Sequence, residues 1–245
     1  MADDKFSYTT SYNTSPYIRK KPKKRSFLSA TVILIIITVL IFLVQVIVDY
    51  ATNGSFTRIF GLVPSDILHG KNLWSIVTTI FLHGSAFHII MNMLSLMFLG
   101  SFLERIVGKK RFLMIYFVSG IVASLFFVFL AGFFGSTSLG SVLFGSLDII
   151  AVGASGAIFG LAATLMILTP KVKVYIFPIP ISMPLWLGVL INLIVLWILS
   201  IAVGLPIGNS AHLGGFICGL AFGLYLRFKY KRRVQVLNQY ILQQR

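Results

Sequence analysis

The feature that most constrains this chain is a series of six apolar segments, each long enough to cross a lipid bilayer. They are residues 27–48, 85–103, 112–134, 149–169, 183–203 and 207–228. A helix of about 20 residues crosses the roughly 30 Å hydrocarbon core. With 57% hydrophobic and 11% charged residues, the chain is too apolar for a soluble globule. The sequence therefore predicts an all-α polytopic membrane protein with a bundle of six transmembrane helices.

The positions of the basic residues orient this bundle, because cytoplasmic loops carry the excess of Lys and Arg. With the N-terminus inside, only Arg58 and Lys71 of the 21 basic residues fall outside. Both termini are therefore predicted to be cytoplasmic, in a multi-pass protein of the plasma (inner) membrane with its site opening to the extracellular side. We expect residues 1–26 to be a disordered basic tail, 27–228 the membrane domain and 229–245 a second basic tail.

The charge and cysteine content exclude several classes of function. The net charge of +15 does not indicate nucleic-acid binding, because the basic residues are divided among loops and do not gather on one face. The single cysteine, Cys218, lies in an apolar segment and is expected to pack in the core. Without a CxxC motif or a disulfide framework, we expect no metal and no cofactor.

The first predicted outside loop, residues 49–84, differs from the others. It is long and half apolar, but Gly and Pro interrupt it too often for it to span the membrane. We expect an amphipathic structure that lies in the outer membrane interface.

Polar side chains within the apolar segments are costly in hydrocarbon, so they mark function or interhelical contacts. The informative ones are His83, His88, Asn92, Ser155, Asn192 and His212. The second, fourth and sixth segments all begin outside, which places His88, Asn92, Ser155 and His212 in one layer about 6 to 12 Å below the outer interface. Asn192 has no partner at a matching depth, and we interpret it as an interhelical hydrogen bond.

Two glycine stripes at four-residue steps predict that the fourth and sixth segments pack closely. The stripes are Gly156 and Gly160 in one segment, and Gly215, Gly219 and Gly223 in the other. Small residues at this spacing let helix backbones approach each other. If the stripes face each other, Ser155 and His212 come within hydrogen-bond reach, as a serine activated by an adjacent base requires.

Each of these residues also has a structural explanation. A serine beside glycines is commonly a packing residue, and a lone histidine serves as a cross-link, a proton relay or a metal ligand. The shared depth of a hydroxyl, an imidazole and a further His and Asn favours catalysis with a stabilised oxyanion. The nearest acidic residue, Asp148, is expected in solvent above Ser155, so the site is predicted to be a Ser-His dyad. Phe159 and His83 are predicted to support the imidazole rings of the site.

Eight different short motifs follow one another between about residues 60 and 223. They are GLVP at 61–64, LW at 73–74, FLHG at 81–84, HIIMN at 88–92, LER at 103–105, RF at 111–112, GASG at 153–156 and AHLGG at 211–215. Together they resemble the motifs of the rhomboid intramembrane serine proteases.

This resemblance implies a role for each residue that matches a family motif. The serine of the GxSG motif is the nucleophile and the histidine of the sixth helix its general base and acid, which carries over to Ser155 and His212. His88 and Asn92, with backbone N–H groups near Gly153 and Ser155, would stabilise the oxyanion. The resemblance also implies substrate entry near the fifth helix and a mobile cap in residues 204–210.

The chain departs from the family pattern at two positions. Ser75 follows the tryptophan of the first loop, where the family usually has Arg, so the contact of that Arg is absent or replaced. Phe159 stands where some bacterial members have Tyr, which keeps the stacking surface and removes a hydroxyl. Neither position belongs to the predicted dyad.

The expected function is an intramembrane serine endopeptidase that acts through an acyl-enzyme. Its expected substrates are single-span or multi-span membrane proteins, cut near the outer interface where small or helix-breaking residues unwind the helix. The alternative is a non-catalytic rhomboid-like membrane chaperone that binds transmembrane segments. A transporter is disfavoured, because no ionisable residue continues the polar layer to the inner side. The sequence leaves the natural substrate and the oligomeric state open.

Overall fold

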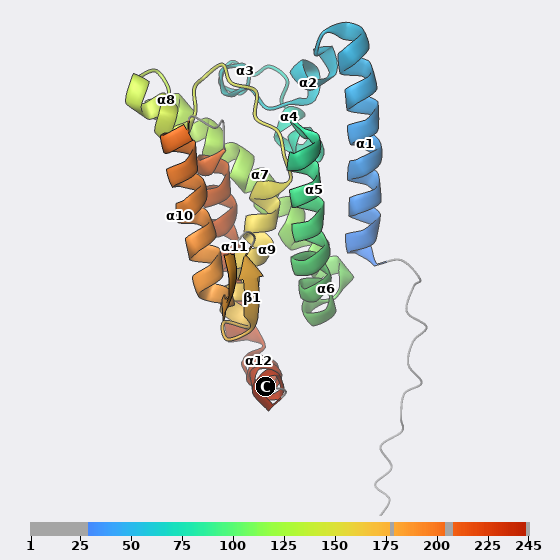
Figure 1. The fold of residues 1–245 in the computed structure, drawn as a ribbon, viewed down its shortest axis with the longest axis vertical. Helices are drawn as coiled ribbons and strands as arrows, with labels where there is room; N and C mark the ends of the chain where they lie inside the picture. The colour runs from blue at the N-terminus through green and yellow to red at the C-terminus, as the bar shows by residue number, and fades with distance from the viewer. Residues whose placement is uncertain (1–28, 177–178, 204–207, 244–245) are drawn as a thin grey trace, which may run out of the picture.

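The computed structural model describes residues 29–176, 179–203 and 208–243, which form a bundle of helices (Figure 1). The tail predicted for residues 1–26 lies outside the described residues. The bundle as a whole agrees with the predicted class, a helical polytopic membrane protein.

Five helices in the described part are long and apolar enough to span a membrane. They are α1 (Ala30–Thr52), the continuous segment Ala86–Val107, α7 (Lys109–Phe134), α10 (Leu185–Val203) and α11 (Asn209–Lys229). The segment Ala86–Val107 consists of α5 (Ala86–Ser95), the π-helical turn η2 (Leu96–Gly100) and α6 (Ser101–Val107). The ends of these helices differ from the predicted ones by a few residues.

The fourth predicted segment forms a shorter helix than expected. α9 (Ser155–Leu168) has 14 residues, or about 21 Å at helical rise, which is less than the hydrocarbon thickness. The chain before it is extended, and Ala151 and Leu62 exchange backbone hydrogen bonds of 2.8 and 3.0 Å. Ser155 therefore begins the helix instead of lying six residues inside it. The count of six membrane spans stays a prediction.

Several short helices gather at one end of the bundle, which we call the outer end (Figure 1). They are α2 (Ser55–Phe60), α3 (Pro64–Leu68), α4 (Ser75–Thr78), the 3-10 turn η1 (Thr79–Phe81) and α8 (Ser138–Phe144). Most of them fall in the loop that was predicted to lie in the interface. Large apolar side chains remain exposed along this loop, among them Ile59, Leu68, Leu73, Trp74 and Val77.

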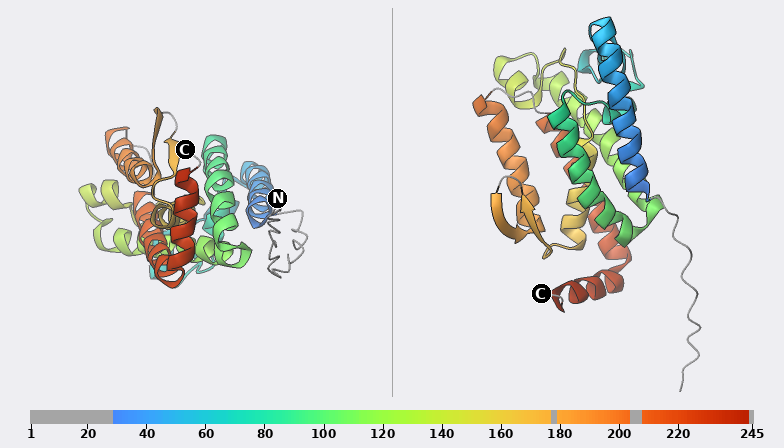
Figure 2. Two further views of the ribbon diagram at one scale, coloured as in Figure 1. Left: turned by 90° about the horizontal axis from the view of Figure 1, so that it is seen from below. Right: turned by 45° about the vertical axis from the view of Figure 1, so that its right-hand side comes forward.

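The opposite end, the inner end, carries a β-hairpin and a helix that the sequence analysis did not predict. β1 (Lys173–Ile176) and β2 (Ile179–Pro184) pair as an antiparallel hairpin. α12 (Lys231–Gln243) runs across the bundle axis (Figure 2). The side-chain amide of Asn238 in α12 donates to the Leu168 carbonyl at the end of α9, 2.8 Å away.

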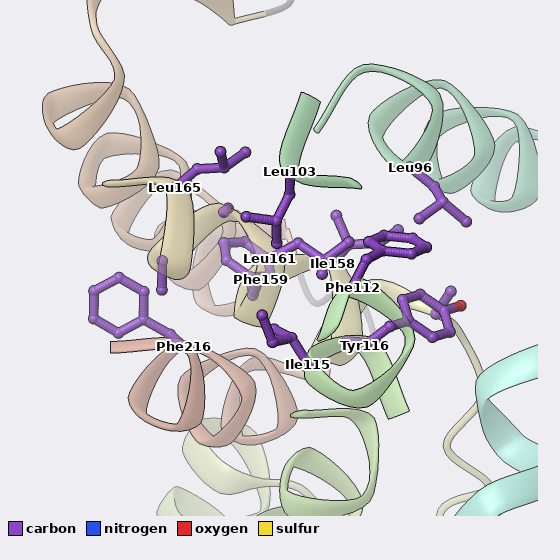
Figure 3. Packing of buried hydrophobic residues seen from close by; sticks show 14 of the residues in the cluster. Leu96, Leu103, Phe112, Ile115, Tyr116, Ile158, Phe159, Leu161, Leu165 and Phe216 are labelled. Carbon is purple, nitrogen blue, oxygen red and sulfur yellow. The ribbon is translucent and has the colours of Figure 1, made fainter. Parts of the chain in front are cut away.

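The buried core surrounds α9, which lies between the longer helices. Figure 3 shows side chains of α9 packed with side chains of α7, α11 and the α5–α6 segment. The fully or nearly fully buried members include Leu96, Leu103, Phe112, Ile115, Tyr116, Ile158, Leu161 and Leu165. Because α9 is enclosed on nearly every side, the position of its first residue is determined by its neighbours.

The carboxylate of Glu104 fastens the inner end of α1 to α6. It accepts hydrogen bonds from the backbone N–H groups of Ala30 and Thr31 at 2.8 and 2.9 Å, and from the Thr31 hydroxyl at 2.7 Å. The first N–H groups of a helix have no partner within the helix, and a carboxylate there also interacts favourably with the helix dipole. Glu104 thus caps α1 from a neighbouring helix.

Candidate functional site

The serine and the histidine predicted as a dyad lie next to each other. Ser155 is the first residue of α9, and His212 lies in the first turn of α11. The Nε2 atom of His212 is 2.8 Å from the Oγ atom of Ser155. His212 is 5% exposed, whereas Ser155 is half-buried. A hydroxyl at this distance from an imidazole nitrogen meets the geometric requirement for general-base activation.

The two glycine stripes explain why these helices come so close. A Cβ atom added at Gly215 would overlap the carbonyl oxygen of Gly156, and one added at Gly219 would overlap that of Gly160. Only glycine leaves room for the neighbouring backbone at these positions. The hydroxyl of Thr164 lies 2.9 Å from the Gly160 carbonyl and 3.0 Å from the Gly219 carbonyl, across the same helix contact.

The imidazole of His212 is held by an aromatic ring and not by a carboxylate. The Phe159 ring lies against it, with centroids 4.7 Å apart and planes inclined by 33°. Within the described residues, His212 Nδ1 has no hydrogen-bond partner. The nearest acidic residue in the sequence, Asp148, accepts a hydrogen bond of 2.9 Å from the Ser65 hydroxyl. The described residues therefore contain a Ser155–His212 pair with no carboxylate bonded to the imidazole.

His88 and Asn92 of α5 face the backbone just before Ser155. A Cβ atom added at Gly153 would come within 2.9 Å of His88 Nε2 and within 3.7 Å of Asn92 Nδ2. Gly153 also has a φ of +132°, a conformation that only glycine adopts readily. The missing side chain at Gly153 therefore leaves room for both polar groups beside Ser155.

The backbone donor of Gly153 has a different partner from the one expected. Its N–H donates to the Thr79 carbonyl over 3.0 Å, so in this structure it is not free to meet an oxyanion. The N-terminus of α9 begins at Ser155, and the first N–H groups of a helix have no partner within that helix. The backbone donors at the site are accordingly those of the first turn of α9.

The His83 ring packs against the His88 ring. It lies 5.1 Å from the His88 ring and 6.4 Å from the Phe42 ring, both in edge-to-face contact. The side-chain amide of Gln45 in α1 both donates to the His83 carbonyl and accepts from its N–H, at 3.0 and 3.1 Å. Burial, and after it the charge of the neighbouring His88, lower the pKa of His83 to about 4, and the backbone of Phe81 opposes part of this shift.

The other residues noted in the sequence lie apart from this cluster. Asn192 is half-buried in α10, and Cys218 is half-buried in α11. Ser75 is buried, and its hydroxyl has no hydrogen-bond partner among the described residues. The neighbouring Trp74 indole donates to the Ile59 carbonyl over 3.0 Å. Most of the predicted cap, residues 204–207, lies outside the described residues.

Two residues that position the site, Thr79 and Gln45, were missed from the sequence. Thr79 supplies the carbonyl that holds Gly153, and its hydroxyl also donates to the Ala151 carbonyl at 2.6 Å. Gln45 holds the His83 backbone from α1. A polar residue within a strongly apolar segment was a usable signal for Gln45. No local signal identified Thr79, because both of its contacts are with backbone groups distant in the sequence, at Ala151 and Gly153.

Among the residues that the structure describes, no group of three or more His, Cys, Asp or Glu side chains is placed to hold a metal ion. The site consists of a hydroxyl, imidazoles, an amide and backbone N–H groups.

These observations define a class: a helical membrane protein in which a serine and a histidine meet at the N-terminus of a short, enclosed helix. Comparison with known proteins then identifies the family. Residues 70–229 match the Rhomboid domain, and this chain belongs to the rhomboid family.

Similar proteins in the family include a named protease and a relative named as inactive. The chain is 37% identical to RHOMBOID-like protein 1 of Arabidopsis thaliana over 162 residues, 65% of this chain and 36% of that protein. It is 30% identical to the rhomboid protease AarA of Providencia stuartii over 226 residues, 87% of this chain and 79% of AarA. Over 85 residues, 35% of this chain and 24% of the relative, it is 38% identical to Inactive RHOMBOID-like protein 8 of Arabidopsis thaliana.

The chain spans only between about a third and a half of the length of the first curated relatives that it matches.

Proposed function

We propose that this protein is an intramembrane serine endopeptidase that acts through a Ser155–His212 dyad. The observation that carries the proposal is the 2.8 Å separation of Ser155 Oγ and His212 Nε2. Membership of the rhomboid family supports it. The name of AarA as a rhomboid protease adds support, since that relative covers 87% of this chain.

The proposed reaction begins with proton transfer within the dyad. His212 Nε2 takes the hydroxyl proton while Ser155 Oγ forms a bond to the substrate carbonyl carbon, giving a tetrahedral oxyanion. Collapse of this intermediate breaks the C–N bond, and His212 gives its proton to the leaving amine. A water molecule, activated by the same imidazole, then hydrolyses the acyl-enzyme.

The oxyanion is proposed to lie between α5 and the start of α9. His88 and Asn92 are directed toward Gly153, next to Ser155, and the first N–H groups of α9, which have no partner within the helix, are at the same helix end. The positive end of the helix dipole adds to this stabilisation. The N–H of Gly153 donates to the Thr79 carbonyl and is not available to the oxyanion. The proposed role of Gly153 is therefore to leave space for the side chains of His88 and Asn92.

The proposed substrates are membrane proteins whose transmembrane segments unwind near the outer end. A helix hides its carbonyls in internal hydrogen bonds, so small or helix-breaking residues favour access. We propose entry near α10, cytoplasmic termini, a plasma-membrane location and a membrane domain over residues 27–228, as the sequence predicts. These proposals concern the whole protein and extend beyond the family assignment.

A non-catalytic chaperone of the same fold is the rival proposal. It requires transmembrane-segment binding but neither the Ser155 hydroxyl nor the His212 imidazole. The existence of a relative named as inactive keeps this rival relevant.

A cleavage assay with purified protein separates the two proposals. A model single-span substrate is offered to the wild type, Ser155→Ala, His212→Ala and the control Ser141→Ala, which removes a half-buried hydroxyl in α8 that donates to the Ser138 carbonyl of the same helix. We expect cleavage by the wild type and the control, and a loss of at least about a hundredfold in the other two. Equal cleavage by all four would refute the dyad. Binding without cleavage by the wild type, on several substrates, would favour the chaperone.

A further inference from the structure

An open groove lies in the inner half of the bundle, between α7 and α11. Its volume is about 440 Å³, and it is lined by Met114, Cys218, Ala221, Phe222 and Tyr225. Met114 and Tyr225 are 45% and 51% exposed, so the groove opens on the outside of the bundle. In α11, its lining residues follow His212 toward the inner end, which separates the groove from the dyad.

Both walls of this groove lead to a basic residue at the inner end. On α11, Cys218, Phe222, Tyr225 and Lys229 follow one another at steps of three or four residues, so they share one helix face. On α7, Arg111 lies one turn from Met114 toward the inner end, by the same spacing. The apolar groove thus ends between Lys229 and Arg111.

Aromatic hydroxyls and rings hold these basic groups in place. Lys229 Nζ donates to the Tyr225 hydroxyl over 2.6 Å. Arg111 donates to the Tyr230 hydroxyl over 2.8 Å, and its guanidinium lies 5.1 Å from the centroid of the Tyr230 ring. The guanidinium of Arg233 lies 5.8 Å from the same ring. We call Arg111, Lys229 and Arg233, with these two tyrosines, the inner cationic cluster.

Among the residues that the structure describes, no carboxylate forms an ion pair with this cluster. The sequence contains no acidic residue after Asp148. Glu104 is the acidic residue of the α5–α6 segment, and it accepts hydrogen bonds from Ala30 and Thr31 at the start of α1. Three cations at the inner membrane surface therefore favour an external anion, and anionic headgroups attract such residues by about 1 kcal/mol each.

The dimensions of the groove suit one lipid molecule. The rise from Cys218 to Lys229 along α11 is about 16 Å, close to half the roughly 30 Å hydrocarbon thickness. We propose that the groove and the inner cationic cluster bind one anionic phospholipid of the inner leaflet. One acyl chain lies along Cys218, Ala221 and Phe222, and the phosphate accepts hydrogen bonds from Lys229 and Arg111. The proposal is independent of the proposed protease activity.

Native mass spectrometry of the purified full-length protein tests this proposal. Retention of dioleoylphosphatidylglycerol is compared with that of dioleoylphosphatidylcholine in the wild type and two variants. Lys229→Gln combined with Arg111→Gln removes the headgroup contacts, and we expect a fall in affinity for the anionic lipid of about 25-fold, about fivefold per cation. Ala221→Phe fills the groove without a change in charge, and we expect a comparable loss.

The control variant combines Lys231→Gln and Arg232→Gln, which removes the same charge from exposed positions of α12. It should keep nearly wild-type lipid retention, and a thermal melt checks that each variant is folded. Unchanged retention in both test variants would overturn the proposal. An equal loss in the control would also overturn it, by showing diffuse attraction to charge. Competition by soluble glycerol phosphate as effective as that of the lipid would exclude a role for the groove.

Discussion

Gly153 is the residue on which the arrangement around Ser155 most depends. Its φ of +132° turns the chain into α9, and its missing side chain makes room for the His88 ring. Any larger residue would be strained in this conformation and would collide with the imidazole. His88 and Asn92 can therefore approach Ser155 because Gly153 has no side chain to occupy the space between them.

Phe159 offers a test of how His212 is positioned. Since His212 Nδ1 has no partner among the described residues, the Phe159 ring is the main lateral support of the imidazole. Such ring pairs contribute about 0.5 to 1.5 kcal/mol. We expect Phe159→Leu to lower kcat of substrate cleavage by about threefold to tenfold, whereas Phe159→Tyr retains the rate. Equal rates in both variants would contradict this role.

The pH dependence of stability tests the burial of His83. Its pKa is about 4 in the folded protein and 6.5 as the ordinary value. Between these two values the unfolded chain binds the proton first, so this residue makes the folded protein less stable as pH falls from 6.5 toward 4. The limiting slope is about 1.4 kcal/mol per pH unit.

The measurement is a thermal melt of the wild type and His83→Asn at pH 7 and pH 5. We expect the wild type to lose more stability than the variant over this interval. The other histidines are present in both proteins, so their contributions cancel in the comparison apart from the coupling between His83 and its neighbour His88. Parallel losses would mean that His83 is not buried in neutral form.

At the scale of elements, the contact between α9 and α11 determines whether the dyad forms. Gly215 faces the carbonyl of Gly156 with no space for a Cβ atom. We expect Gly215→Ala to push the helices apart, to cost about 1 to 3 kcal/mol of stability and to slow cleavage strongly. Gly208→Ala is the matched control, because a Cβ atom there meets the nearest atom at 3.8 Å. Wild-type activity in Gly215→Ala would contradict a tight helix contact.

The sequence predicted the elements that depend on local composition. Apolar length located the five long helices, and the spacing of Gly156, Gly160, Gly215 and Gly219 indicated which helices pack together. The proximity of Ser155 and His212 was inferred from that spacing. Their chemical roles stay predictions that the assays above address.

Features that depend on distant partners were not predictable. The late start of α9 follows from the pairing of Ala151 with Leu62, which hydropathy does not encode. The Gly153 N–H donates a hydrogen bond to the Thr79 carbonyl. Because both groups belong to the backbone, no residue type in the sequence indicates this contact. α12 was expected only as a basic tail, because its apolar positions are too few for a span and its support comes from Asn238 and α9.

At the scale of the whole molecule, the two ends of the bundle have different chemistry. The outer half holds Ser155, His212, His88 and Asn92, and the inner end holds the inner cationic cluster. The two proposals require this separation: the proposed nucleophile lies in the outer half, and the proposed lipid headgroup binds at the inner end. The cytoplasmic location of the basic segments stays a prediction from the distribution of Lys and Arg.

Labelling of the full-length protein in liposomes with a serine-directed fluorophosphonate tests the central claim most directly. The modified residue is mapped by mass spectrometry in the wild type, Ser155→Ala and His212→Ala. We predict modification of Ser155 in the wild type, none at that position or elsewhere in Ser155→Ala, and at least about a hundredfold slower labelling in His212→Ala. Labelling that persists in Ser155→Ala, or that proceeds at the wild-type rate in His212→Ala, would contradict a nucleophilic serine activated by this histidine.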